Sequence, residues 1–273
     1  MKHSFLVGGL LTLLMTASGF GQSIAFEDFD SDSNLLSFTT SANVPAGGFT
    51  NAGDAFQEYT RLVDTSFPFN IADDSVTGSD GGAPFAGDTN GFLGSDFDNN
   101  TIFGITDTWN GDTNFGEEVT GTWSFDISSA TAPLVVNIDM VAMNDYAGST
   151  VNSNVDFFYQ IDGGGYQSLF TSSIATGTTR DYTMDNGLVV TYDDPLNMTS
   201  NTGTLYELND NMQTLLANVD GLGNQLDIQV RVNMDGSESF GLDNIRISTI
   251  PEPTSATLLL VGLGALALRR RRK

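Results

Sequence analysis

The stretch NQLDIQVRVNMDG, residues 224–236, decides the fold class because apolar and polar residues alternate along it without a break. Its apolar residues are Leu226, Ile228, Val230, Val232 and Met234. Successive side chains of a strand point to opposite faces. The pattern therefore predicts a strand with one face on a core and the other toward solvent.

Similar short segments recur between turns rich in Gly, Asn, Asp, Ser and Thr. Residues 154–170 predict a hairpin that turns at Gly163-Gly164-Gly165. Residues 132–145 form a longer apolar run and predict a central strand, and shorter strands are expected at 24–29, 120–128 and 188–192. Many short strands at such spacing are typical of an all-β sandwich. Residues 41–100 are rich in loop signals and predict long connections within one domain.

Two segments depart from simple alternation. Residues 205–219 have apolar residues at helix-like spacing, but nearby glycines and neighbouring strands favour a strand at 212–219. In residues 239–248 the apolar positions change parity between Leu242 and Ile245. A bulge near Asp243-Asn244 would let both halves of that strand bury their apolar side chains.

The charge balance excludes several kinds of chemistry. Residues 22–250 hold four basic residues against 33 acidic ones, a net charge of −29. They contain no Cys, His or Lys. A Ser-His-Asp site, a Schiff base and a His/Cys zinc site are therefore excluded there. Nucleic acid would be repelled. Carboxylate chemistry and binding of hard cations stay open.

Both ends of the chain carry apolar segments. Residues 1–21 have a short basic start, an apolar run at 5–15 and small residues after it, which predicts a secretory signal peptide with a helical centre. Residues 256–268 form a second apolar helix, flanked by PEP at 251–253 and a cationic block at 269–273. A helix of this length is a marginal membrane anchor, because spanning needs about 20 residues. The alternative to a segment that is recognised and then removed is a plain C-terminal membrane anchor.

The C-terminal layout resembles the bacterial PEP-CTERM sorting signal. The matching residues are Pro251, Glu252, Pro253, Arg269, Arg270, Arg271 and Arg272. The resemblance implies export through the secretion translocon and transient anchoring in the inner membrane. It also implies processing by an exosortase-type enzyme and delivery to the cell surface or the extracellular matrix of a biofilm rich in exopolysaccharide.

Residues 22–250 resemble secreted jelly-roll domains related to galactose-binding-like and carbohydrate-binding modules. The resemblance is carried by IAFEDF at 24–29, YQIDGGGY at 159–166 and the stretch 223–248. It implies a two-sheet jelly-roll sandwich and a structural Ca²⁺ held by Glu27 or Asp28 and by Asp243. Asp28, Asp30 and Asp32 also alternate like the first ligands of an EF-hand loop, but that loop's Gly and Glu are missing here.

Trp109 lies in a loop-like segment and is the best candidate for a carbohydrate-binding aromatic residue. Trp123 alternates with apolar neighbours and is expected in the core. We expect a non-enzymatic surface or matrix protein, structural or adhesive, that binds polysaccharide. The alternative is a secreted glycan hydrolase with paired carboxylates, but Glu117-Glu118 supplies no second acid at a defined distance.

Overall fold

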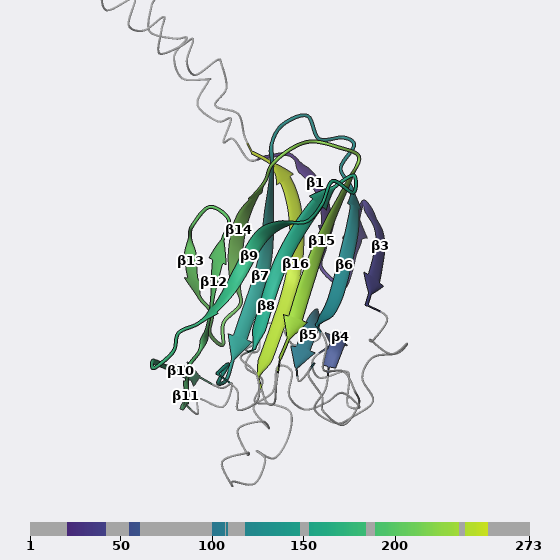
Figure 1. Ribbon diagram of the computed structural model, residues 1–273. Coiled ribbons are helices and arrows are strands. Elements are labelled where there is room, and N and C mark those ends of the chain that lie inside the picture. Colours follow the sequence, from purple (N-terminus) through teal and green to yellow (C-terminus); the bar gives the residue numbers. More distant parts are fainter. Residues whose placement is uncertain are drawn as a thin grey trace, which may run out of the picture.

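The computed structural model describes residues 21–41, 55–60, 100–106, 108, 118–147, 153–183, 189–234 and 238–250. Within these ranges the chain forms strands, turns and bends and contains no helix. The strands make two sheets that pack face to face, with a small hairpin at one end (Figure 1). The predicted all-β, two-sheet jelly-roll sandwich is therefore confirmed.

The first sheet, sheet A, contains the first and the last of the described strands. Its strands are β1 (Ser23–Glu27), β2 (Asp32–Ser33), β4 (Ala55–Thr60), β5 (Thr101–Thr106), β7 (Leu134–Met143), β14 (Gln213–Val219) and β16 (Ser239–Thr249). The main order is β14-β7-β16-β1-β2. Strand β1 pairs with the C-terminal half of β16, and β5 pairs with its N-terminal half. Strand β4 pairs with β5. The run at 132–145 is thus an internal strand, as predicted.

The second sheet, sheet B, is built around the alternating stretch. Its strands are β3 (Leu35–Thr40), β6 (Val119–Asp126), β8 (Asn154–Ile161), β9 (Gln167–Ile174), β12 (Leu196–Ser200), β13 (Leu205–Glu207) and β15 (Gln225–Asn233). They follow the order β13-β12-β9-β8-β15-β6-β3. A separate hairpin consists of β10 (Thr179–Thr183) and β11 (Val189–Asp193).

The core lies between the inner faces of the two sheets. All five apolar residues of the stretch 224–236 are fully buried in it. Trp123 is 1% exposed and meets the Phe103 ring edge-on, with ring centroids 5.2 Å apart. The buried apolar residues of this core lie between Ile24 and Ile247, so the segment 22–250 carries a core of its own.

The two irregular segments follow the sequence interpretation. The segment at 212–219 is strand β14, not a helix. Strand β16 shifts register against β7 between Asp243 and Arg246, and Asn244 has a φ of 54° there. Leu242 and Ile245 are both fully buried as a result. The bulge thus rotates the second half of β16 so that both halves face the core.

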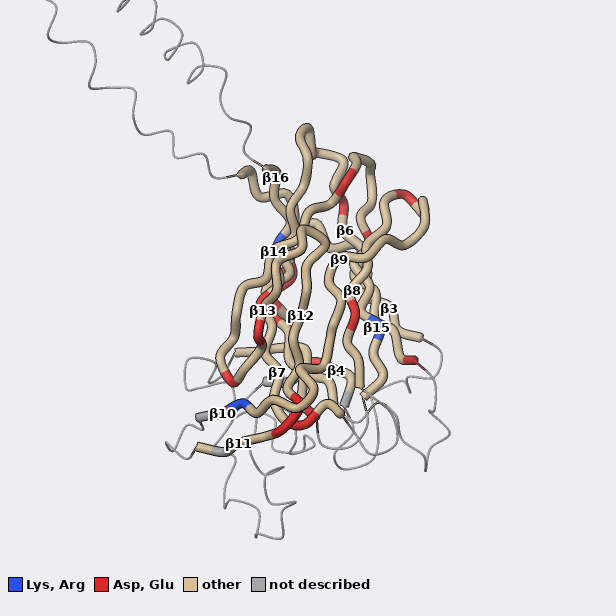
Figure 2. The backbone as a smooth tube through the Cα atoms, turned by 60° about the vertical axis from the view of Figure 1, so that its left-hand side comes forward, with Lys and Arg blue, Asp and Glu red and all other residues tan. Residues whose placement is uncertain are grey.

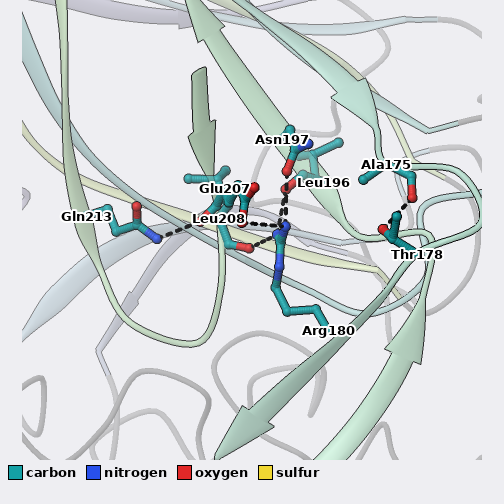
Figure 3. Close-up of polar contacts among 8 residues, drawn as sticks. All are labelled: Ala175, Thr178, Arg180, Leu196, Asn197, Glu207, Leu208 and Gln213. Atoms are coloured by element: carbon teal, nitrogen blue, oxygen red, sulfur yellow. Dashed lines mark hydrogen bonds and ion pairs between the residues drawn. The ribbon is translucent and has the colours of Figure 1, made fainter. Parts of the chain in front are cut away.

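Arg180 fastens the β10–β11 hairpin to sheet B (Figure 3). Its guanidinium donates to the carbonyl oxygen of Leu196 at 3.1 Å and to that of Leu208. It also donates to Asn197 Oδ1 at 3.1 Å and lies 3.7 Å from Glu207 Oε2. Because β10 makes its ladder only with β11, this side chain is a main link between the hairpin and the sandwich.

The two ends of the described sandwich meet. The Thr249 amide donates to the carbonyl of Gln22 at 2.9 Å, and the Ile250 amide donates to that of Pro133 at 2.7 Å. No helix in the described ranges is long and apolar enough to cross a membrane. Residues 1–20 of the predicted signal peptide (1–21) and the whole sorting segment 251–273 lie outside the described residues, so the proposed domain boundaries stay predictions.

Candidate functional site

The three acids predicted to hold calcium lie where β1 meets the bulge of β16. Glu27 ends β1 and is paired with Ile245, and Asp243 stands at the bulge itself. Glu27 and Asp243 are 8% and 1% exposed, respectively. Asp28 follows Glu27 and accepts hydrogen bonds from the amide of Ser31 at 2.6 Å and from its hydroxyl at 3.0 Å.

Burial and repulsion from neighbouring carboxylates make Glu27 and Asp243 reluctant to ionise. The pKa of Asp243 is raised to about 7, mainly by burial. The carboxylates of Asp139 and Asp28 contribute to this rise, and hydrogen bonds from Asn244 and Asn100 oppose it. The pKa of Glu27 is raised by burial and by nearby acids including Asp28, although the Phe29 amide donates to Glu27 Oε1 at 2.6 Å. Asp28 therefore acts electrostatically on both of the other predicted ligands.

Across the part of the chain that the structure describes, no group of three or more Asp, Glu, His or Cys side chains is arranged to hold a metal ion. Asp30, the second acid of the EF-hand-like run, instead accepts from the amide and hydroxyl of Thr101, at 3.2 and 2.8 Å. The Ca²⁺ ligands Glu27, Asp28 and Asp243 therefore stay a prediction.

The remaining predicted positions differ in whether the structure describes them. Trp109 and Glu117 lie outside the described residues, so the aromatic carbohydrate contact stays a prediction. Trp123 is buried between the sheets, as its alternation with Phe125 and Ile127 indicated.

The outward face of sheet B carries a cluster that the sequence interpretation missed. We call the surface formed by Thr122, Phe158, Tyr166, Gln229 and Arg231 the arginine face. In the central part of the sheet Gln229 pairs with Thr122 on β6 and with Phe158 on β8. Paired residues of antiparallel strands share a face, so these side chains meet on the side opposite the core.

Arg231 is held in one orientation by its neighbours on this face. Its guanidinium carbon lies 4.2 Å from the centre of the Phe158 ring and 5.2 Å from that of Tyr166. Its Nε donates to Gln229 Oε1 at 2.8 Å. No described residue accepts a hydrogen bond from its two terminal nitrogens. The result is a fixed cation with unused donors beside two aromatic rings.

Gln229 completes the network. Its Nε2 donates to the Thr122 hydroxyl at 3.0 Å and to the Tyr166 hydroxyl at 3.1 Å. One pleat further along β15, Asp227 accepts from Gln160 at 2.8 Å and from Gln225 at 2.7 Å. The sequence shows the polar positions of this strand, but the aromatic partners come from β8 and the following turn, and only the fold brings them together.

The arginine face is unusual on a surface with few cations. Figure 2 shows acidic residues along many described segments and basic residues at few places. Arg180 is occupied by the hairpin contacts, and Arg246 lies 3.5 Å from Asp139 Oδ2 on sheet A. Among the described arginines, Arg231 alone has no carboxylate within ion-pair distance. Within the described residues it is therefore a positive charge without an ion-pair partner.

The comparisons with known proteins identify the C-terminal signal. Residues 249–273 match the family model described as the PEP-CTERM protein-sorting motif. This confirms the sequence interpretation of the tail and defines the class of protein: an exported protein with a C-terminal sorting tail. No curated protein matches the chain significantly.

The solved structures similar to this chain include three carbohydrate-binding modules. The CBM22-1 xylan-binding domain from Paenibacillus barcinonensis Xyn10C has 9% identity, a TM-score of 0.33, and coverage of 86% of this chain and 99% of its own. The family 11 module from Clostridium thermocellum, in complex with a β-1,3-1,4-mixed-linked tetrasaccharide, has 9% identity, a TM-score of 0.31, and coverage of 85% and 99%. TmCBM61, in complex with β-1,4-galactotriose, has 8% identity, a TM-score of 0.30, and coverage of 55% and 72%. At these TM-scores the similarities assign neither a ligand nor a site residue to this chain.

Proposed function

We propose that this exported protein is a non-enzymatic, structural or adhesive component of the cell surface or extracellular matrix, and that its arginine face binds a polysaccharide. The observation that carries the proposal is Arg231, fixed between Phe158 and Tyr166 with its terminal nitrogens unused by described residues. Donors that are already ordered lose little entropy on binding, which favours recognition of a ligand rich in oxygen acceptors.

The chemistry around Arg231 suits sugar rings. Sugars present hydroxyl groups at their edges and C–H groups on their faces. The amide of Gln229 and the hydroxyl of Tyr166 can exchange hydrogen bonds with hydroxyls, and the rings of Phe158 and Tyr166 can pack against C–H groups. An extended sheet surface gives a linear polymer room to lie along several residues.

Calcium enters the proposal as a structural ion at Glu27, Asp28 and Asp243. It would relieve the repulsion among these acids, because a divalent cation favours their ionised forms. These residues lie on sheet A, so the ion would stabilise the sandwich without contacting the arginine face.

The proposal is tested by sedimenting the 22–250 segment with polysaccharide extracted from the matrix of the producing bacterium. We expect the protein to co-sediment and no reducing ends to be released. Failure to co-sediment would remove the binding function. Released reducing ends that disappear when acids are changed to amides would establish the alternative, a hydrolase with paired carboxylates.

A further inference from the structure

A cleft of about 350 Å³ opens at the end of the sandwich, where the edge of sheet A meets sheet B. It lies between the end of β14, the start of β9, the end of β8 and the turn after β12. Its volume is at the lower end of the range for small-molecule sites, about 300–1,000 Å³. A site of this size accommodates one or two sugar rings and not a long polymer segment.

The walls of the cleft are fixed by Asn201 in the turn after β12. Its Nδ2 donates to the carbonyl of Asn218 at 2.7 Å, and its Oδ1 accepts from the amide of Asn218 at 3.0 Å. The side chain thus pairs with β14 as a neighbouring strand would. Because Asn201 directly follows strand β12 of sheet B and Asn218 lies in β14 of sheet A, this pair joins the two sheets beside the cleft.

The floor of the cleft is fixed by the hydroxyl of Tyr159. The hydroxyl donates to Gln167 Oε1 at 3.1 Å and accepts from the amide of Asp220 at 3.1 Å. The Tyr159 side chain is otherwise buried. The cleft therefore exists before any ligand arrives, which lowers the entropy cost of binding.

Three polar groups that line the cleft have no partner among the described residues. They are the side-chain amide nitrogen of Gln167, the side-chain amide of Asn218 and the carboxylate of Asp220. Together they offer donors from two amides, an acceptor oxygen and a carboxylate that can accept from two adjacent hydroxyls. Asp220 is the charged residue of the lining, so an anionic ligand would be repelled.

We propose that this cleft is a second ligand site, separate from the arginine face, and that it takes a single hydroxyl-rich sugar unit without negative charge. The fit rests on the fixed walls, the small volume and the amide–carboxylate lining. The site goes beyond the proposed function, because a second sugar-binding position on the same domain would let one molecule contact two glycan chains. Such bivalent contact increases avidity when the geometry permits both to bind.

The test is an NMR titration of the ¹⁵N-labelled 22–250 segment with glucose, glucosamine and glucuronate. We expect glucose or glucosamine to shift the amide signals of Asn201, Asn218 and Asp220, and glucuronate to leave them in place. Asp220→Ala is expected to weaken binding at least about tenfold, as loss of a charged hydrogen-bond partner does. Asp220 is exposed, so this variant keeps its fold.

The control is Arg231→Ala, which removes the arginine face and is expected to leave the cleft titration unchanged. No shift with any of the three sugars would overturn the proposal, and so would equal binding of glucuronate or an unchanged affinity in Asp220→Ala. Loss of polysaccharide binding in Arg231→Ala with an intact cleft titration would separate the two sites. Failure of one proposal is therefore distinguishable from failure of the other.

Discussion

Changing Asp243 to Asn should alter how the stability of the protein depends on pH. Asp243 as a whole residue is 1% exposed, and burial is the main cause that raises the pKa of its carboxyl group from 3.8 to about 7. Between these values the folded state holds a proton that the unfolded state has released, so the free energy of unfolding falls as pH rises. A shift of this size corresponds to a loss of at most about 4 kcal/mol between pH 4 and pH 8.

The neutral Asn side chain removes this titration. It keeps an oxygen for the Asn244 amide, which donates to Asp243 Oδ1 at 2.6 Å. It loses Oδ2, which accepts from Asn100 Nδ2 at 3.2 Å and from Asn244 Nδ2 at 3.0 Å. A cost of about 2 kcal/mol is therefore expected at acid pH. The stability of Asp243→Asn relative to wild type should therefore rise steadily from pH 4 to pH 8.

The assay is urea unfolding of the 22–250 segment at several pH values in buffer with chelator. Glu27 and Glu58 also have raised pKa values, so both proteins share a background slope, and the difference between them isolates Asp243. Asp126→Asn is the control, because hydrogen bonds from Ser128 lower the pKa of that exposed carboxyl. Identical pH slopes in wild type and Asp243→Asn would refute the reasoning.

Calcium extends the same comparison. If the ion binds the three predicted ligands, adding it at pH 8 should raise the melting temperature of wild type and have little effect on Asp243→Asn, because binding to the native state alone stabilises it. Equal responses of the two proteins would remove Asp243 from the site.

Three further outcomes are expected. Arg180→Ala should destabilise the 22–250 segment by about 2 kcal/mol, since two carbonyls lose a charged donor. The control Arg246→Ala removes a single exposed ion pair and should cost about 0.5 kcal/mol. Equal losses in urea unfolding would contradict the role given to Arg180. Trp109→Ala should weaken polysaccharide binding several-fold at an unchanged melting temperature, and an unchanged affinity would retire that residue. The mature protein from its native host should lack the apolar tail, so an intact mass that includes Arg269–Arg272 would count against processing of the sorting signal.

The sequence predicts the sandwich well because its signals are local. The alternation along residues 224–236 predicts a strand, and β15 confirms it. The parity change before Ile245 predicts a bulge, and the register shift in β16 confirms it. Strand β14 was ambiguous because Leu215 and Leu216 fit either period, and its pairing with β7 decides the matter.

The candidate sites are less accessible to sequence reasoning because they depend on strand order. Arg231 and Phe158 are far apart in the chain, and only the β15–β8 pairing brings them together. The cleft likewise joins Asn201 to Asn218 across two sheets. In contrast, Glu27 and Asp243 could be proposed as neighbours from the sequence. The jelly-roll domains that the chain resembles are expected to place their first and last strands side by side, as β1 and β16 are.

The most direct test of the account is affinity electrophoresis of the 22–250 segment in gels that contain the matrix polysaccharide. Wild type and Arg246→Ala should be retarded to the same degree, while Arg231→Ala, with the identical change in charge, should be retarded much less, because only the cleft remains to contact the polysaccharide. If Arg231→Ala is retarded as strongly as Arg246→Ala, the arginine face does not bind the polysaccharide and the proposed function is wrong.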